Sequence, residues 1–208
     1  MKFYGQFKLD EFLYNNFFKN HRNGFFVECG AFDGLTEVTC KFFEEFMNWS
    51  GINLEPVPYI YNKLVKNRPK SINLDYALSD FNGPSIFTQA IHPKLGNSFG
   101  NGSLKHAEAH KKQLISQKCS FETFKVECRR FVDIFAKYTK EIDLFVLDVE
   151  GHELSALEGI LPLDNKYLPK VFCIEYPIVG LDCLSKKLKG HYALDKTYRN
   201  NAIFIKNS

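Results

Sequence analysis

Short runs of continuous apolar residues that close at an acidic residue constrain the fold of this chain most. Residues 144–147 read LFVL and precede Asp148, and residues 170–175 read KVFCIE. Unbroken apolar strands are typical of a parallel sheet that helices cover on both faces. Between the runs, apolar residues recur at helical spacing, as at Phe131, Ile134 and Phe135. This alternation of strands and helices predicts an α/β fold.

The order of the predicted elements favours a three-layer α/β sandwich built as a single domain over residues 1–208. We expect a mostly parallel sheet with an antiparallel hairpin at its C-terminal end. Strands are predicted at 25–29, 51–55, 72–78, 85–89, 121–128, 144–147, 170–175, 192–197 and 201–206. Helices are predicted at 36–48 after a Thr36 cap, 58–66, 103–117 after a Ser103 cap, 131–138, 152–161 and 181–188.

The stretch 90–118 interrupts this regular order. Its first part reads HPKLGNSFGNGS, which is rich in the Gly, Asn and Ser residues of loops. A loop of this length inside a compact domain is usually functional. We therefore expect residues 90–118 to form an insertion that covers the ligand site.

The composition excludes several classes of protein. With 45% hydrophobic and 25% charged residues, the chain is not disordered over most of its length. A net charge of +3 does not indicate nucleic-acid binding. No apolar run approaches the ~20 residues of a membrane span, and the N-terminus lacks the apolar stretch of a signal peptide. The six cysteines form no CxxC pair, so we expect reduced thiols in a cytoplasmic protein.

Acidic residues stand at or near the predicted ends of several strands. They are Glu28, Glu55, Asp75, Asp148 and Glu175. Ligands of open α/β sheets bind outside the carboxyl ends of the strands. A single strand-end carboxylate can equally be a cap or a solvated side chain. Several along one rim favour a ligand with hydroxyls, an amino group or a positive centre, and they oppose a polyphosphate.

The first strand leads into a glycine-containing turn, residues 28–34, that reads ECGAFDG. The pattern is ExGxxxG, whereas dinucleotide-binding folds carry GxGxxG. Phe32 stands where a glycine would let the backbone approach a pyrophosphate, so we expect no such group here. Glu55 follows Gly34 by 21 residues and ends the second strand, which is where an acid binds ribose hydroxyls.

Three motifs then give the chain a family resemblance. Residues 24–34 (GFFVECGAFDG), 53–68 (NLEPVPYIYNKLVKNR) and 142–160 (IDLFVLDVEGHELSALEGI) resemble the signature of FkbM-type methyltransferases. Residues 24–68 also resemble the methyltransferase-like domain of animal Star-type proteins. The FkbM resemblance implies a Rossmann-like class I methyltransferase sandwich with S-adenosylmethionine (SAM) as methyl donor. It also implies O-methylation, often of a sugar or a polyketide hydroxyl.

The resemblance implies roles for individual residues. Glu28, Gly30 and Gly34 would hold the methionine end of SAM, Glu55 the ribose diol, Asp75 and Ala77 the adenine, and Asp148 would face the methyl-transfer centre. If the insertion covers the acceptor, Asn97, Ser98 and His106 would contact it. Glu175 is also expected on the substrate side.

Removal of the hydroxyl proton needs a base or a metal ion. His152 is the candidate base, although it could equally pack at a helix start. Asp148 and Glu175 are candidate ligands of a divalent cation, and Glu150 is interpreted as a helix-start residue that the helix dipole favours.

The sequence therefore predicts a SAM-dependent O-methyltransferase that acts on a carbohydrate. Analogy with the family suggests a deoxyhexose such as rhamnose, free or in a glycan, as the acceptor. We expect neither nucleic acid as a partner nor a membrane span. Methylation of a lipid or polyketide hydroxyl is the alternative reaction. A non-catalytic Star-like interaction module is the alternative class of function. The three acids Glu28, Glu55 and Asp148 argue against that module, because a binding module does not need all three.

Overall fold

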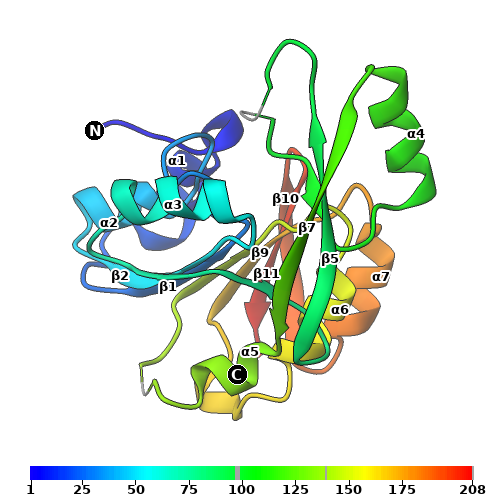
Figure 1. The fold of residues 1–208 in the computed structure, drawn as a ribbon. Helices are drawn as coiled ribbons and strands as arrows, with labels where there is room; N and C mark the ends of the chain where they lie inside the picture. Colours follow the sequence, from blue (N-terminus) through cyan, green and yellow to red (C-terminus); the bar gives the residue numbers. More distant parts are fainter. Residues whose placement is uncertain (97–98, 139, 208) are drawn as a thin grey trace.

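The computed structural model describes residues 1–96, 99–138 and 140–207. Its centre is a seven-stranded sheet in the order β10-β11-β9-β8-β1-β2-β3 (Figure 1). The five strands from β9 to β3 run parallel, whereas β11 is antiparallel to both β9 and β10. The predicted parallel sheet with a C-terminal antiparallel hairpin is therefore confirmed.

The central sheet and the helices around it have the following bounds. The strands are β1 (Phe25–Cys29), β2 (Ser50–Leu54), β3 (Ile72–Leu74), β8 (Leu144–Leu147), β9 (Val171–Glu175), β10 (Tyr192–Tyr198) and β11 (Asn201–Lys206). The helices are α1 (Leu9–Leu13), α2 (Lys41–Phe46), α3 (Pro58–Asn67), α4 (Glu108–Ser116), α5 (Phe131–Phe135), α6 (Glu153–Ile160) and α7 (Leu181–Leu188). Short helical turns are η1 (Gln6–Lys8), η2 (Tyr14–Phe18) and η3 (Asn165–Tyr167).

Two hydrophobic cores lie on the two faces of the central sheet. Because side chains alternate along a strand, Phe25 and Val27 of β1 face the core under α5, α6 and α7, whereas Phe26 faces the core under α1 and α2. Figure 1 shows α1, α2 and α3 on one side of the sheet and α6 and α7 on the other. These are the three layers that the sequence predicts.

A second, four-stranded sheet stands beside the first in the order β4-β7-β5-β6. Its strands are β4 (Tyr76–Leu78), β5 (Gly83–Ile91), β6 (Gly102–Ser103) and β7 (Ser120–Arg129), and β5 and β7 form a long ribbon next to α4 (Figure 1). The single strand predicted at 72–78 is therefore wrong. It divides at Asp75, so that β3 joins the central sheet and β4 joins the small one.

The predicted insertion is also more regular than a loop. Residues 90–118 hold the end of β5, the short strand β6 and helix α4. Ser103 lies in β6, and Ala107 stands at the N-terminus of α4, so the predicted Ser103 cap is wrong.

Helix α2 is shorter than the predicted helix at 36–48. The Asp33 carboxylate accepts hydrogen bonds from the backbone N–H groups of Leu35 and Thr36, which stabilises a turn there instead of a helix. The predicted Thr36 cap is wrong for this reason. All six cysteines are free thiols. Among the described residues, no helix combines the length and the apolar character that crossing a bilayer requires.

Candidate functional site

A cavity of about 570 Å³ opens at the carboxyl ends of the central strands. The turns that follow β1, β2 and β8 form one side of it, and β4, β5 and the segment 99–104 form the other. Its volume lies in the usual range of small-molecule sites, roughly 300–1,000 Å³. Of the residues singled out from the sequence, it brings together Gly30, Glu55, Ala77, Asp148, His152 and Glu175.

Glu55 is the buried carboxylate at the end of β2. Its side chain is only 6% exposed, and its Oε1 accepts a hydrogen bond of 2.9 Å from the backbone N–H of Val57. Burial raises the pKa of Glu55 to about 7, and no basic side chain of the described residues compensates its charge. A ligand with two hydroxyl groups could donate to this carboxylate and offset the cost of burying it.

Gly30 lets the turn after β1 lie close to the end of β8. Its φ is +85°, and an added Cβ would lie 2.0 Å from the carbonyl oxygen of Asp148. The backbone N–H of Asp148 in turn donates to the carbonyl of Cys29 at 3.1 Å. A glycine is therefore required at position 30 to bring the ends of β1 and β8 together at the floor of the cavity.

Three carboxylates meet beside this floor. One carboxylate oxygen from each of Asp148, Glu150 and Glu175 lies within 4.8 Å of the other two. Burial raises the pKa of Asp148 to about 6, and burial together with the neighbouring carboxylates raises the pKa of Glu175 to about 10. This acidic triad is the part of the cavity most suited to hold positive charge.

The sequence analysis missed the place of Glu150 in this triad. Glu150 precedes helix α6 in a turn with φ of +52°, and Gly151 follows with φ of +96°. The Glu153 carboxylate accepts hydrogen bonds from the N–H groups of Val149 and Gly151, both at 3.1 Å, and so fixes this turn. Gly151, which adopts a positive φ without steric cost, was the sequence signal for the turn that carries Glu150 into the cavity.

His152 also lines the cavity, at the N-terminus of α6. Its Nε2 lies 3.0 Å from the hydroxyl oxygen of Ser79. Burial lowers its pKa, and Lys105 lowers it further, whereas Asp80 acts in the opposite direction. A histidine in these surroundings is neutral near pH 7 and is able to accept a proton.

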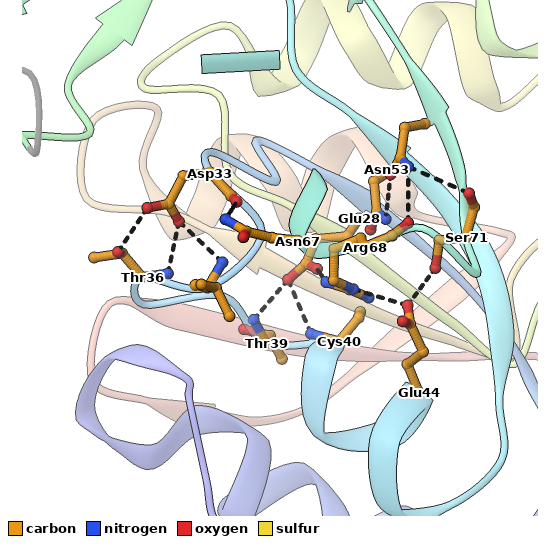
Figure 2. A network of polar contacts seen from close by, with 12 residues as sticks. Glu28, Asp33, Thr36, Thr39, Cys40, Glu44, Asn53, Asn67, Arg68 and Ser71 are labelled. Carbon is orange, nitrogen blue, oxygen red and sulfur yellow. Dashed lines mark hydrogen bonds and ion pairs between the residues drawn. The ribbon is translucent and has the colours of Figure 1, made fainter. Parts of the chain in front are cut away.

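Glu28 does not line the cavity. On β1 it alternates with Val27 and Cys29, so its side chain points to the opposite face, toward the start of α2. Its Oε1 accepts hydrogen bonds from the N–H groups of Thr39 (2.6 Å) and Cys40 (2.9 Å), as Figure 2 shows. The place of Glu28 is therefore that of a buried carboxylate that organises the start of α2.

Arg68 completes this buried network. Its side chain is fully buried, with Nη1 3.4 Å from the Glu28 carboxylate and Nε 2.8 Å from the Glu44 carboxylate (Figure 2). Burial raises the pKa of Glu28, while Arg68 and the two N–H groups lower it. The Glu28 oxygens face three hydrogen-bond donors, namely Arg68 and the N–H groups of Thr39 and Cys40. An ionised carboxylate has only acceptors, so the ionised form of Glu28 fits this environment.

Three other predicted site residues lie outside the cavity lining. Gly34, with φ of +78°, packs against α3, because an added Cβ would lie 2.7 Å from Arg68. Asp75 is exposed between β3 and β4. His106 is partly buried, with Nε2 3.0 Å from the Thr88 carbonyl. Asn97 and Ser98 lie outside the described residues.

The side of the cavity opposite the central sheet comes from the small sheet and its loop. Gln89 of β5 is 2% exposed, and its Nε2 donates to the carbonyl oxygen of Phe99 at 2.9 Å. The N–H of Ala90 donates to the carbonyl of Asn101 at 2.9 Å. These bonds hold residues 99–102 as a wall of the cavity, which we call the 99–102 wall.

The charge of the lining is one-sided. Five acidic residues line the cavity, namely Glu37, Glu55, Asp148, Glu150 and Glu175. No lysine or arginine lines it within the described ranges. Such a cavity attracts cations and neutral hydrogen-bond donors, and it disfavours phosphate groups.

The model of the methyltransferase FkbM domain matches residues 28–177, which is well over half of the chain. A TehB-like SAM-dependent methyltransferase from Corynebacterium glutamicum is 10% identical and aligns over 95% of this chain and 87% of its own, with a TM-score of 0.47. Fibrillarin from Aeropyrum pernix, solved with natively bound SAM, is 8% identical over 89% of this chain and 67% of its own, with a TM-score of 0.46.

A human methyltransferase 10 domain containing protein is 11% identical over 90% of this chain and 73% of its own, with a TM-score of 0.47. No curated protein matches the chain in sequence.

Proposed function

The chain belongs to the FkbM family of SAM-dependent methyltransferases, and from that premise we propose that it transfers the methyl group of SAM to a hydroxyl of a carbohydrate. A deoxyhexose such as rhamnose, free or within a glycan, is the expected acceptor. The observation that carries this proposal is an acidic cavity that holds Glu55, Asp148 and His152 together. No lysine or arginine among the described residues lines it, which supports a neutral sugar over a phosphorylated one. The cytoplasmic location stays a prediction.

The residues of the cavity fit SAM by their chemistry. The buried, uncompensated carboxylate of Glu55 would accept hydrogen bonds from the ribose hydroxyls. Ala77 lines the same side of the cavity and would lie beside the adenine. Gly30 and Asp148 would face the methionine end, where carboxylates favour a positive sulfonium and ammonium. Bound SAM supplies an electrophilic methyl group.

His152 accepts the proton of the acceptor hydroxyl in the proposed reaction. The hydroxyl oxygen forms the bond to the methyl carbon, the bond between that carbon and sulfur breaks, and the hydroxyl proton ends on the imidazole. The lowered pKa of His152 keeps the ring neutral before the reaction, as a base requires. Glu175 lies on the same rim and would accept hydrogen bonds from the acceptor or share its proton with Asp148.

The acidic triad would also hold a divalent cation. Asp148, Glu150 and Glu175 offer the oxygen ligands that Mg²⁺ and Ca²⁺ prefer. A metal there would supply Lewis-acid activation of a hydroxyl.

Two alternatives remain as outcomes of the test. Leu95, Phe99 and Leu104 add apolar surface to the lining, which would suit a lipid or polyketide hydroxyl. A non-catalytic Star-like module would bind a ligand without turning it over.

The test compares His152→Gln, Asp148→Asn and the chelated wild type in transfer of labelled methyl from SAM. With His152 as base, His152→Gln lowers turnover by about 10²–10⁴-fold and leaves SAM affinity unchanged. With a metal as activator, EDTA and Asp148→Asn abolish turnover, and His152→Gln has a mild effect. Normal rates in all three arms would reject both mechanisms, and an absence of turnover with SAM bound would favour the Star-like module.

A further inference from the structure

Ser79 is a buried residue that contacts His152 from behind the cavity. It follows β4 directly, its side chain is 0% exposed, and its backbone N–H donates to the carbonyl of Arg129 at 3.1 Å. Its hydroxyl oxygen lies 3.0 Å from His152 Nε2 and 2.9 Å from Asp80 Oδ1. The three side chains therefore form a chain of hydrogen bonds that begins at the solvent, since Asp80 is exposed, and ends at the cavity.

The directions of these hydrogen bonds follow from the donors available. A carboxylate accepts only, so the Ser79 hydroxyl donates its single proton to Asp80. The Ser79 oxygen then has only lone pairs to offer to His152. Nε2 must therefore carry the ring proton and donate, and a neutral ring with its proton on Nε2 has its free lone pair on Nδ1. Among the described residues, Nδ1 has no hydrogen-bond partner.

Helix packing holds the two partners at this distance. Gly159 lies two turns after His152 on α6, and an added Cβ there would be 2.1 Å from the carbonyl oxygen of Ser79. The helix thus contacts the backbone of Ser79 at Gly159 and its side chain at His152. The partners cannot separate without moving α6 away from β4.

We propose that Ser79, oriented by Asp80, is a positioning residue that fixes His152 in the tautomer with the proton on Nε2 and thereby makes Nδ1 the atom that accepts the proton of the acceptor hydroxyl. The assignment of the reacting nitrogen rests on the proposed function. The tautomer itself does not, and it can be measured without substrate.

The first arm of the test measures the tautomer directly. The full chain is labelled with ¹⁵N-histidine, and two-bond ¹⁵N–¹H correlation spectra are recorded at a pH where the ring is neutral. The signals of His152 are those that disappear in His152→Gln. The wild type is expected to show a protonated Nε2 and an unprotonated Nδ1.

The variants change the direction of the hydrogen bonds. In Asp80→Ala, no side chain at position 80 accepts the proton of the Ser79 hydroxyl, so the hydroxyl can donate to Nε2 and a population with the ring proton on Nδ1 is expected. In Ser79→Ala, neither tautomer is selected and averaged signals are expected. Asp133→Ala is the matched control, because Asp133 is an exposed carboxylate that contacts Asn82, close to the same strand end. The control is expected to leave the wild-type tautomer unchanged.

The second arm measures turnover. Asp80→Ala is expected to lower kcat by up to about tenfold with little change in KM, because rings with the proton on Nδ1 have no free lone pair on that atom. Ser79→Ala is expected to lower it less, and Asp133→Ala not at all. A wild-type ring with its proton on Nδ1, or an unchanged tautomer in Asp80→Ala, would overturn the inference while leaving the methyltransferase proposal standing. Full turnover in His152→Gln would instead remove the base assignment on which the second arm rests.

Discussion

Two strand-end acids, Glu55 and Asp75, show how the surroundings of a residue decide its role. Both follow a strand of the central sheet, and the family resemblance implies a cofactor role for both. Glu55 is buried in the cavity, whereas Asp75 is exposed where the chain passes from β3 to β4. The sequence could not reveal this difference, because it depends on which sheet the strand after Asp75 joins.

We predict that Glu55→Gln weakens SAM binding by about 1–3 kcal/mol, the scale of lost hydrogen bonds to a charged group. The amide keeps the shape of the side chain but loses the charge that pairs with the ribose hydroxyls. Isothermal titration calorimetry measures the effect, and Asp75→Asn is the control. Equal losses in both variants would contradict the placement of the ribose at the end of β2.

Glu28 is the residue whose predicted and observed surroundings differ most. Removing its charge leaves the fully buried Arg68 with one carboxylate fewer. We therefore predict that Glu28→Gln lowers the free energy of unfolding by about 3–5 kcal/mol, as breaking a buried ion pair does. Urea denaturation of the SAM-free protein measures this. If the stability is unchanged and the SAM affinity is lost, Glu28 instead binds the cofactor, as the family resemblance implies.

At the scale of elements, the sequence predicted the buried strands best. β8 and β1 have the predicted bounds, because a strand buried on both faces needs a continuous apolar run. The start of α2 was wrong by several residues, since the Asp33 turn precedes it. Among the strand-end carboxylates singled out from the sequence, Glu55, Asp148 and Glu175 line the cavity, whereas Glu28 and Asp75 do not. Glu150 enters the cavity through a turn, and Ser79 contacts His152 from the end of a strand of the second sheet. Neither position follows from the pattern of strands and helices.

The small sheet offers a prediction at the scale of elements, because Gln89 holds the 99–102 wall against β5. Gln89→Ala removes the donor to the Phe99 carbonyl and leaves Glu55 and Gly30 in place. We expect a several-fold rise in KM for the acceptor with an unchanged dissociation constant for SAM. Steady-state kinetics combined with calorimetry separates the two constants. A weaker SAM affinity and a normal acceptor KM would show that the wall contacts the cofactor instead.

At the scale of the whole molecule, the acidic cavity makes stability depend on pH. The folded-state pKa values of Glu55 (about 7), Asp148 (about 6) and Glu175 (about 10) lie above the usual values of carboxyl groups. Carboxyl groups with raised pKa values bind more protons in the folded state than in the unfolded state. Their stabilising contribution is therefore complete below about pH 4 and is lost as the pH rises through the folded-state values.

We predict that the ligand-free protein loses on the order of a few kcal/mol of unfolding free energy between pH 5 and pH 8. Glu175→Gln should flatten this dependence, because it removes one of the three clustered carboxylates. Urea denaturation at a series of pH values measures the slope, and Glu158→Gln, an exposed acid outside the cavity, is the control. A slope of opposite sign would mean that the cavity carboxylates are stabilised as anions by groups other than those described.

The most direct test of the account is the fate of the SAM methyl group. The purified chain is incubated with ¹³C-methyl SAM and a panel of neutral sugars, their phosphorylated forms, glycans, and lipid and polyketide alcohols, and the labelled product is identified by mass and by the atom to which the methyl is bonded. We expect a methyl ether on a neutral carbohydrate and no product from the phosphorylated forms. Labelled methyl on nitrogen, or efficient methylation of a sugar phosphate, would contradict it.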